Sequence, residues 1–421
     1  MGKTSRKQIP REVVQEQRAV TVGEVLVDVG ADLRELMVKG GLAIAAALFT
    51  EELAQLCGPR YERGEGLASR WGARQGEVVL GGRKVKLRRP RVRQDGHEVE
   101  LETYRRLQAE DPLTERALEQ MLVGVSTRKY ARSLEPAPAG LTETATSKSA
   151  VSRRFVAKTQ EQLEAALAQP LGDRTWLALL IDGIQLHEHV VLVVLGVDDT
   201  GDKHVLAFRE GSTENATLCR EMLADLVARG VPADRSLLVV IDGGKGLRKA
   251  VNDVFGQYAP VQRCQVHKKR NVLDHLPDQM RAQTRAALSE AYAAVSYELA
   301  LAQLQNLARS LGKKQPSAAS SLREGMEETL TVKKLGISGW LAKTLETTNP
   351  IENLNKGIRR VSARVDRCRS GAMALRWVAT GALESARGFR RLKGHAQIGK
   401  LIAALRARDA ELGAADVRRA G

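Results

Sequence analysis

Two apolar stretches of the chain end in the same tripeptide, Leu177-Ala-Leu-Leu-Ile-Asp182-Gly183 and Leu237-Leu-Val-Val-Ile-Asp242-Gly243. Continuous apolar runs of this length are typical of strands that are buried on both faces of a sheet. Functional groups gather at the carboxyl ends of such strands. An Asp-Gly pair is also an ordinary turn signal. The matched endings nevertheless favour neighbouring strands with two adjacent carboxylates, which need a cation between them.

The sequence around these two stretches alternates between strand and helix patterns. After the first stretch we expect strands at 190–197 and 203–208, joined by a turn at 198–202. A helix at 214–230, a strand at 236–241, a helix at 247–255 and a strand at 261–266 follow. Residues 268–345 carry no strand signal and are rich in Ala and Leu. The sequence therefore predicts an α/β domain that is followed by an all-helical segment.

The N-terminal part of the chain changes its pattern twice. Residues 22–57 have helical spacing, whereas 76–103 alternate polar and apolar residues around Gly81-Gly82 and Asp95-Gly96, which predicts a small antiparallel sheet. Helical spacing returns at 112–168. There, Gly124–Arg132 and Ser147–Phe155 are two candidate helices of a helix-turn-helix-like unit. A plain helical linker with a solvated basic face is the alternative.

The composition points to a polyanionic partner. The 421 residues include 66 Lys and Arg against 50 Asp and Glu, a net charge of +16, and the segment Arg83–Arg93 alone holds seven basic residues. Such a charge suits DNA, RNA or an acidic membrane surface. The aromatic content of 4% argues against a stacking platform for single strands. Four scattered cysteines indicate a reducing compartment, and the apolar run at 41–49 is about half a membrane span.

A third carboxylate stands in the run Thr347-Thr-Asn-Pro-Ile-Glu352-Asn-Leu-Asn-Lys356. Two strand-borne carboxylates and one helix-borne carboxylate can hold a pair of divalent ions, and Mg²⁺ prefers such hard oxygen ligands. Glu346 is a second carboxylate in this region, but it lies outside the run. Metal ions together with a polyanionic partner predict phosphodiester chemistry on nucleic acid.

The motifs together resemble the Mutator-type transposases of bacterial insertion sequences. The matching stretches are Asp182-Gly-Ile, Gly211-Ser-Thr-Glu-Asn215, Arg229-Gly-Val, Val240-Ile-Asp-Gly-Gly-Lys-Gly-Leu247, Val261-Gln-Arg-Cys-Gln-Val-His-Lys-Lys-Arg-Asn271 and Thr347-Thr-Asn-Pro-Ile-Glu-Asn-Leu-Asn355. The resemblance covers roughly residues 10–400. Two departures are Cys219, where the family usually has a tryptophan, and Val361, which cuts short an arginine run.

The resemblance implies an RNase H-like mixed-sheet catalytic domain that is interrupted by an all-helical insertion. Asp182, Asp242 and Glu352 are then the catalytic triad and the ligands of two Mg²⁺ ions, with Mn²⁺ as a possible substitute. The implied segments are 1–75 (helical; dimerisation or DNA binding), 76–111 (small β region), 112–172 (helix-turn-helix-like), 173–270 (first part of the catalytic core), 271–345 (insertion), 346–390 (second part) and 391–421 (basic tail).

The function implied is a transposase that binds terminal inverted repeats and catalyses metal-dependent cleavage and strand transfer of double-stranded DNA. A homodimer in the bacterial cytoplasm, associated with the nucleoid and not with a membrane, is expected. Two alternatives stay open. One is an RNase H-like nuclease without strand transfer, and the other is a silent, transposase-derived DNA-binding protein.

Further candidate residues lie around the triad and in the basic segments. Cys264 and His267 supply two ligands where structural zinc needs four, so no zinc is expected. They either line the site or form a packed core pair. The full site-lining set is Cys264, His267, Asn349 and Asn353. The candidate DNA-binding residues are Arg83, Lys84, Lys86, Arg88, Arg89, Arg91, Arg93, Lys148, Arg153, Arg154, Lys268, Lys269, Arg270, Arg359 and Arg360.

Overall fold

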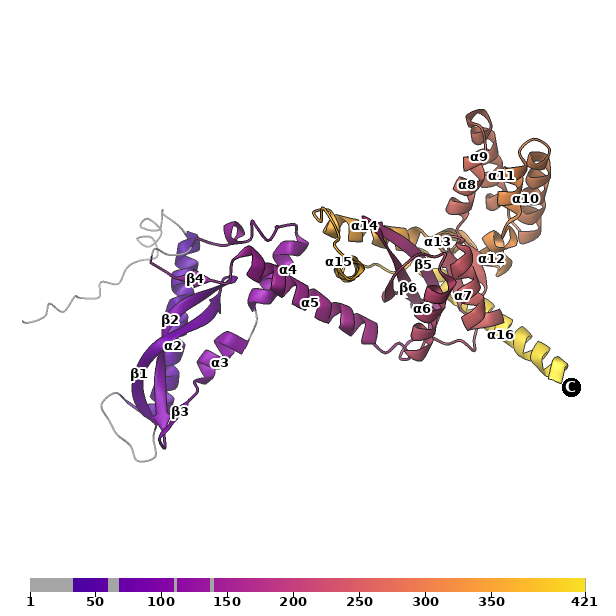
Figure 1. The fold of residues 1–421 in the computed structure, drawn as a ribbon. Coiled ribbons are helices and arrows are strands. Elements are labelled where there is room, and N and C mark those ends of the chain that lie inside the picture. The colour runs from indigo at the N-terminus through magenta and orange to yellow at the C-terminus, as the bar shows by residue number, and fades with distance from the viewer. Residues whose placement is uncertain (1–32, 60–67, 110–111, 137–139, 421) are drawn as a thin grey trace, which may run out of the picture. The chain divides into compact units, whose positions relative to one another are not determined.

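The computed structural model describes residues 33–59, 68–109, 112–136 and 140–420 (Figure 1). The chain divides into two compact units. The first contains the described residues up to Ala117 together with Thr127–Ser152, and the second contains Leu118–Ser126 and the described residues from Arg153 onward. The helices α4 (Pro112–Leu122) and α5 (Lys148–Ala168) each cross from one unit into the other. The part of the expected N-terminal helical region before residue 33 lies outside the described residues.

The first unit is built around a long antiparallel ribbon. Its elements are α2 (Leu33–Cys57), β1 (Ser69–Leu80), β2 (Arg83–Gln94), β3 (His97–Val99), α3 (Glu102–Ala109), η1 (Ala131–Ser133) and β4 (Glu143–Thr144). β2 pairs with β1, β3 and β4. The expected small sheet and both of its turns are confirmed. Asp95, Gly96, Gly81 and Gly82 all have positive φ angles, as tight hairpin turns of two residues require.

The core of the first unit lies between the ribbon and the helices. Phe49 and Cys57 of α2 pack with Val78 and Val92 of the strands, and Leu101 and Tyr104 complete the cluster. By length and composition alone, Met37–Cys57 is also apolar enough to cross a membrane, and 17% of that window is buried. The apolar segment of this helix is therefore longer than the run at 41–49 that the sequence analysis identified.

The first helix of the expected helix-turn-helix does not form. Residues 124–130 are turns and open segments that lead into η1, and only the second expected helix is present, as α5. Gly124, with φ of +96°, terminates α4. Tyr130 is fully buried, and its hydroxyl donates to the carbonyl of Gly82 at 2.7 Å. This tertiary contact fixes the segment in a non-helical path, so the helical expectation was wrong.

The second unit contains a five-stranded sheet with the order β7-β6-β5-β8-β9. Its strands are β5 (Trp176–Leu186), β6 (His189–Asp198), β7 (Lys203–Glu210), β8 (Leu238–Ile241) and β9 (Val261–Arg263). β6 is antiparallel to both of its neighbours, β5 and β7, whereas β5, β8 and β9 are parallel. The strand expected at 261–266 ends three residues early, because α8 (Gln265–Asp274) begins there.

Both faces of this sheet are covered, as the apolar strands predicted. Leu179 and Ile181 of β5 face a core that includes α6 (Ala216–Ala228) and α7 (Lys245–Phe255). Leu180 and Ile184 face the opposite core, to which α14 (Asn349–Ser362), α15 (Gly371–Ala386) and α16 (Ile398–Ala420) contribute. This alternation is the period-two pattern of a buried strand. The domain is therefore a mixed α/β structure with helices on both sides of the sheet.

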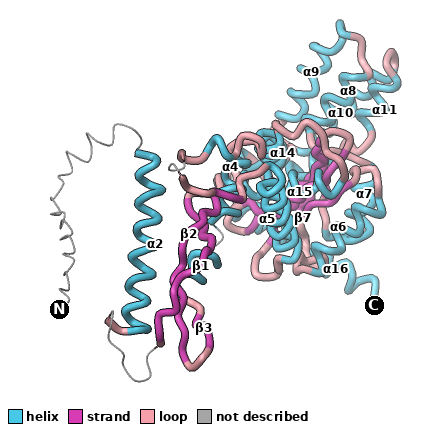
Figure 2. Tube along the Cα trace, turned by 60° about the vertical axis from the view of Figure 1, so that its left-hand side comes forward, coloured by secondary structure: helices cyan, strands magenta, loops and turns pink. Residues whose placement is uncertain are grey.

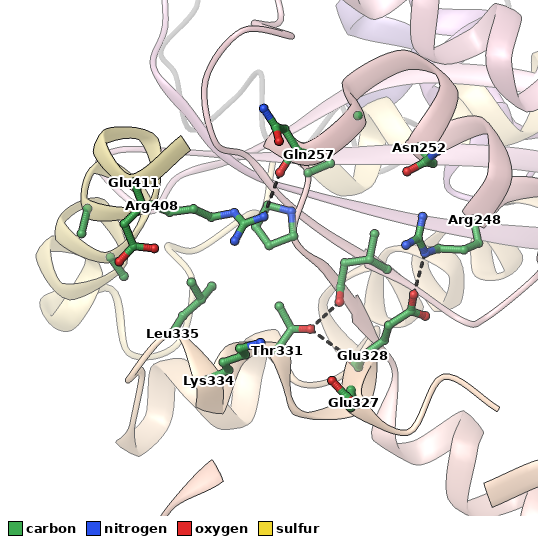
Figure 3. Close-up of a pocket in the computed structure, with 16 residues that line it drawn as sticks. Arg248, Asn252, Gln257, Glu327, Glu328, Thr331, Lys334, Leu335, Arg408 and Glu411 are labelled. Carbon is green, nitrogen blue, oxygen red and sulfur yellow. Dashed lines mark hydrogen bonds and ion pairs between the residues drawn. The ribbon is translucent and has the colours of Figure 1, made fainter. Parts of the chain in front are cut away.

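The segment between β9 and α14 is entirely helical, as expected. It consists of α8, α9 (Asp278–Ala293), α10 (Tyr297–Gly312), α11 (Pro316–Arg323), η3 (Glu327–Leu330), α12 (Thr331–Lys334) and α13 (Gly339–Leu345). The helices α8 to α11 share a hydrophobic core of their own. In Figures 1 and 2 they form a group beside the sheet. The remaining short helices are η2 (Gly256–Tyr258) and η4 (His395–Gln397). A pocket between α7, η3, α12 and α16 is lined by residues that include Arg248, Glu328, Lys334 and Arg408 (Figure 3). Neither Asp182 nor Asp242 is among its lining residues.

Candidate active site

Asp182 and Asp242 lie on neighbouring parallel strands. Ile181 pairs with Ile241 in the ladder between β5 and β8, so the two aspartates occupy equivalent places directly after this pair. β8 ends at Ile241, whereas β5 continues to Leu186 because β6 stays paired with it. Asp182 is therefore inside its strand and not at its end, which corrects the sequence interpretation. The side chain of Asp182 lies on the same face of β5 as Leu180 and Ile184, which is the face that α14 covers.

The pKa of Asp182 depends on its burial and on the charges around it. Its pKa is raised to about 6, first by burial, then by the negative charge of Asp242 and, to a smaller extent, by that of Glu352. His267 acts in the opposite direction. The charges of Asp242, Glu352 and His267 therefore all act on the carboxyl group of Asp182.

The third carboxylate reaches the pair through α14. Asn355 on this helix is buried, and its Nδ2 donates to Asp182 Oδ2 at 2.9 Å. Glu352 lies three residues earlier, on the same face of the helix. The backbone N–H of Gly244 meanwhile donates to Asp242 Oδ1 at 3.0 Å. One oxygen of each aspartate is thus held by the protein, and α14 brings Glu352 to the same place.

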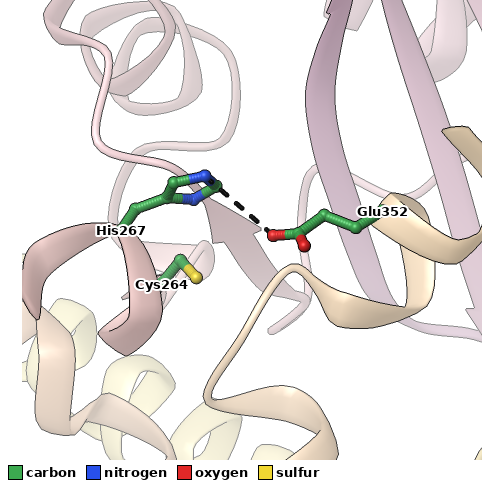
Figure 4. A group of neighbouring side chains, drawn as sticks. All are labelled: Cys264, His267 and Glu352. Atoms are coloured by element: carbon green, nitrogen blue, oxygen red, sulfur yellow. Dashed lines mark ion pairs between the residues drawn. The ribbon is translucent and has the colours of Figure 1, made fainter. Parts of the chain in front are cut away.

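The side chains of Cys264, His267 and Glu352 lie together near the start of α14 (Figure 4). Ligand atoms of Cys264, His267 and Glu352 lie within 4.8 Å of one another. The hydroxyl of Thr348 lies among them, at 3.3 Å from Cys264 Sγ, 3.4 Å from His267 Nδ1 and 2.9 Å from Glu352 Oε1. His267 Nε2 is 4.0 Å from the same carboxylate oxygen. The Thr348 hydroxyl has one proton, which it donates either to Glu352 Oε1 or to Cys264 Sγ, and its backbone N–H also donates to Cys264 Sγ at 3.4 Å.

The charges in this group depend on one another. Burial raises the pKa of Cys264, but hydrogen bonds from His267 and Thr348 outweigh it, so the pKa of the thiol is lowered overall. The pKa of His267 is raised, first by its hydrogen bond with Cys264 and then by the charges of Asp182 and Glu352. The raised pKa of His267 favours its imidazolium form, whose positive charge offsets part of the repulsion between the carboxylates. His267 is half-buried beside Glu352, whereas Cys264 is fully buried, and the site-lining role of both residues stays a prediction.

Backbone contacts across the helical insertion explain how Glu352 reaches the sheet. The N–H of Cys264 donates to the carbonyl of Ile241 at 2.8 Å, and the N–H of Gln265 donates to the carbonyl of Glu346 at 3.0 Å. The buried side chain of Gln262 forms hydrogen bonds with Thr329 and Val332, which come after the helices α8 to α11 in the chain. The residues before and after the insertion are thereby joined, and α14 starts beside the end of β9.

Comparison with known proteins places this arrangement in a family. The model of the "Transposase, Mutator family" matches residues 20–388, which is most of the chain. The chain belongs to the Mutator family of transposases. A transposase for insertion sequence element ISRM5 of Rhizobium meliloti (strain 1021) is 31% identical over 310 residues, which cover 71% of this chain and 75% of the relative.

Two mycobacterial relatives have a comparable sequence identity to this chain, but the matched parts of the chain differ in length. The transposase for IS6120 of Mycolicibacterium smegmatis is 32% identical over 49% of this chain and 64% of its own length. The transposase for IS1081 of Mycobacterium tuberculosis is 30% identical over 75% of this chain and 76% of its own length. The chain thus spans a little less than two thirds of the first relative and about three quarters of the second.

Not all of the expected site-lining residues of this transposase-family chain lie at the carboxylates. Asn349 and Asn353 are exposed on α14, and no described side-chain contact joins them to Asp182 or Asp242. Asn355, which the sequence analysis did not select, takes that place. The spacing of three residues from Glu352 was the available signal, since it puts both side chains on one face of a helix.

Three expected DNA contacts have structural roles instead. Arg83 is 3% exposed and bonds to Glu143 at 2.6 Å, and Arg89 is 5% exposed beneath Tyr104 and near Glu98. Lys268 donates from Nζ to the carbonyls of Ser321 and Glu324 at the end of α11. These side chains are not available to phosphates. Among the other candidates, Lys86, Arg88, Lys148, Arg153, Arg270, Arg359 and Arg360 are exposed, and Lys84, Arg91, Arg93, Arg154 and Lys269 are half-buried.

Proposed function

We propose that this chain is a transposase that binds the terminal inverted repeats of an insertion sequence and catalyses metal-dependent DNA cleavage and strand transfer. Asp182, Asp242 and Glu352 are the proposed catalytic residues. The observation that carries the proposal is the bond from Asn355 to Asp182, because it brings the helix of Glu352 to two carboxylates on neighbouring strands. Substrate and activity are proposals for this chain, whereas membership of the family is established by the comparisons.

The sheet supports the proposed RNase H-like domain. Three antiparallel strands in chain order, followed by two parallel strands on the other side of the first strand, are the arrangement expected for such a domain. The proposed carboxylates then lie on the central strand β5, directly after the adjacent strand β8, and on a helix beyond the insertion. Strand order, carboxylate positions and the helical insertion therefore agree with the resemblance.

The residues present fit Mg²⁺. The donors are carboxylate oxygens, which this hard cation prefers, and the raised pKa of Asp182 reflects burial beside another acid, a situation that a cation relieves. Oδ1 of Asn355 is buried without a hydrogen-bond partner in the described structure, and a metal-bound water is a suitable donor to it. Asp182, Asp242 and Glu352 would hold two Mg²⁺ ions, and Mn²⁺ is a proposed substitute.

The protein's own contribution to the reaction is orientation. Bound Mg²⁺ would activate the attacking water or 3′-hydroxyl and neutralise charge on the leaving oxygen. Asn355 and the backbone N–H of Gly183 orient the carboxylate of Asp182, and the N–H of Gly244 orients that of Asp242. Thr348 is placed to donate to Glu352 Oε1, and the raised pKa of His267 favours a positive charge close to the acids.

Double-stranded DNA is the proposed substrate and partner. The relatives are named as transposases for insertion sequences, and the net charge of +16 suits a polyanion. We also propose that the protein acts as a homodimer. Sedimentation of the purified protein with and without DNA measures this directly, and a monomer in both states would overturn it.

The decisive experiment uses labelled transposon-end DNA, unlabelled target DNA and Mg²⁺. Joined products support the proposal. Cut products without joining indicate a nuclease, and binding without cutting indicates a silent DNA-binding protein. Asp182→Asn and Asp242→Asn are expected to remove both cutting and joining but to retain DNA binding. Asp199→Asn is the matched control, because this exposed aspartate lies in the hairpin turn between β6 and β7. Full cleavage by either site variant contradicts the assignment.

A further inference from the structure

An exposed tryptophan lies on the ribbon of the first unit, at an irregularity in its ladder. Trp71 of β1 is 42% exposed. Between Arg70 and Ala73 the register with β2 shifts. Gly72 there has a φ angle of +75°, and a Cβ atom at this residue would meet open space. A bulge of this kind redirects a side chain out of the regular alternation of the strand. The backbone is thus shaped to present Trp71 on the surface.

Two arginines of the neighbouring strand stack on this ring. The guanidinium carbons of Arg91 and Arg93 lie 4.0 and 3.5 Å from the centroid of Trp71. Arg91 is also held by Glu98, with 2.7 Å between Nη2 and Oε2. Nε of both arginines is buried without a hydrogen-bond partner in the described structure. Stacking orients a planar guanidinium while its outer N–H groups stay able to donate in the plane.

Oriented guanidinium groups suit DNA bases. The major groove of duplex DNA admits a two-stranded β-ribbon, and a planar guanidinium can donate two hydrogen bonds to one guanine edge. Exposed Arg74 and Arg88 on the same ribbon add positive charge for the phosphates. A single-strand platform needs aromatic rings for successive bases. Trp71 is the one large exposed aromatic among the described residues of the first unit.

We propose that the β1–β2 ribbon enters a groove of duplex DNA, and that Trp71 orients Arg91 and Arg93 to read base edges. The inference rests on the proposed function, because it names the surface with which the transposase recognises DNA. It also moves base recognition away from the expected helix-turn-helix, whose first helix is absent from the described residues 124–130. Trp71 is a positioning residue here, and the two arginines make the contacts.

The test compares five full-length proteins on a pool of short duplexes with randomised sequence. The native protein selects its preferred duplexes, and the affinities of every variant for these and for scrambled duplexes are then measured over a range of salt concentrations. Trp71→Ala is expected to lower the preference for selected duplexes about tenfold. It removes no charge, so the slope of affinity against salt concentration should not change. Trp71→Phe keeps a ring and should restore most of the preference.

The remaining variant separates base reading from charge. Arg93→Lys retains the charge and hence the salt slope, but it lacks the bidentate donor pair, so the preference should fall while scrambled duplexes bind as before. A matched control removes two charges elsewhere in the unit: Arg105→Ala with Arg106→Ala, on the exposed side of α3, should retain the preference. Thermal melting of each variant verifies that it is folded.

The possible results distinguish this inference from the proposed function. If Trp71→Ala and Arg93→Lys, both folded, select the same duplexes as the native protein with equal preference, the ribbon does not read bases and the inference is overturned. If the native protein retains no duplex from the pool, recognition of terminal repeats fails as well. Loss of preference in the α3 control to the same extent would also contradict the role of the ribbon.

Discussion

The active site and the ribbon hold their functional side chains in different ways. In the active site, partners come from distant parts of the chain: Asn355 bonds to Asp182 across 173 positions, and Thr348 bonds to Cys264 across 84. In the ribbon, the partners are strand neighbours, because Arg91 and Arg93 stack on Trp71 within one hairpin. The first arrangement depends on the whole second unit, whereas the second depends on one ladder and its bulge.

This difference affects what a substitution does. Side chains in the active site are buried or half-buried among like charges, so a change there alters chemistry and stability together. Side chains at the exposed side of the ribbon can be changed with little effect on folding, while those on its covered side cannot. The largest effects are therefore expected where a carboxylate of the active site is lost, and the smallest where a contact only orients one.

The largest effect is expected at Glu352. Replacement with Gln removes a charged metal ligand from the proposed site, and the loss of several kcal/mol of transition-state stabilisation lowers the cleavage rate about a thousandfold or more. The measurement is single-turnover cleavage of labelled transposon-end DNA. Glu346→Gln is the matched control. Glu346 is buried six residues earlier, and its backbone carbonyl, which the substitution leaves in place, makes the bond to Gln265. Equal losses in the two variants would contradict the assignment of Glu352.

On the covered side of the ribbon we expect a loss of stability without a specific loss of base preference. Arg83→Ala removes the buried arginine that forms an ion pair with Glu143. Losing this pair costs about 3 kcal/mol of unfolding free energy. Arg88→Ala, at an exposed position of the same strand, is expected to change that free energy by less than about 0.5 kcal/mol. Chemical denaturation of both variants measures the contrast. Similar values for the two would mean that the ribbon has no covered side.

The sequence predicted the sheet and its two aspartates because local patterns determine them. Apolar runs bounded by Asp-Gly indicate buried strands, and β5 and β8 are neighbours in register, as the matched endings suggested. The continuation of β5 past Asp182 could not be seen locally. It depends on pairing with β6, whose register is a property of the folded sheet.

Other residues were beyond local patterns for physical reasons. Seven basic residues in Arg83–Arg93 alternate between the two sides of a strand, but only the packing of α2 and α3 decides which side is covered. Arg83 and Arg89 were therefore assigned to DNA wrongly. Asn355 was overlooked for a related reason: its partner Asp182 is brought to it by contacts across the insertion, which leave no signal in the neighbouring sequence.

The protonation of Asp182 predicts how stability depends on pH. Its pKa of about 6 in the folded protein exceeds its ordinary value of 3.8, so the folded state binds this proton more tightly than the unfolded state does. Stability therefore falls as the pH rises from about 4 to 6, and the cost, roughly 3 kcal/mol, is complete above pH 6. Asp182→Asn removes this cost, so the variant should be more stable than the native protein above pH 6 and similar to it near pH 4. Chemical denaturation at both pH values measures the difference.

Magnesium provides the control for that comparison. Above pH 6, Mg²⁺ is expected to raise the melting temperature of the native protein, because it binds the ionised pair in the folded state. The same addition should have little effect near pH 4, where Asp182 is protonated, or on Asp182→Asn at either pH. Melting temperatures with Mg²⁺ and with an equal ionic strength of NaCl separate ion binding from screening. A native protein that is stabilised equally by both salts would contradict a metal site at Asp182.

The smallest catalytic effect is expected at Asn355, which orients Asp182 but does not itself hold charge. Asn355→Ala removes the bond to Asp182 Oδ2, and the loss of such a supporting contact typically costs roughly 10- to 100-fold in metal affinity or activity. Because the carboxylates remain, higher Mg²⁺ concentrations should restore part of the cleavage rate, whereas Glu352→Gln should not recover. The measurement is the Mg²⁺ concentration that gives half-maximal cleavage. An unchanged value together with a lower maximal rate would show that Asn355 acts on the DNA and not through Asp182.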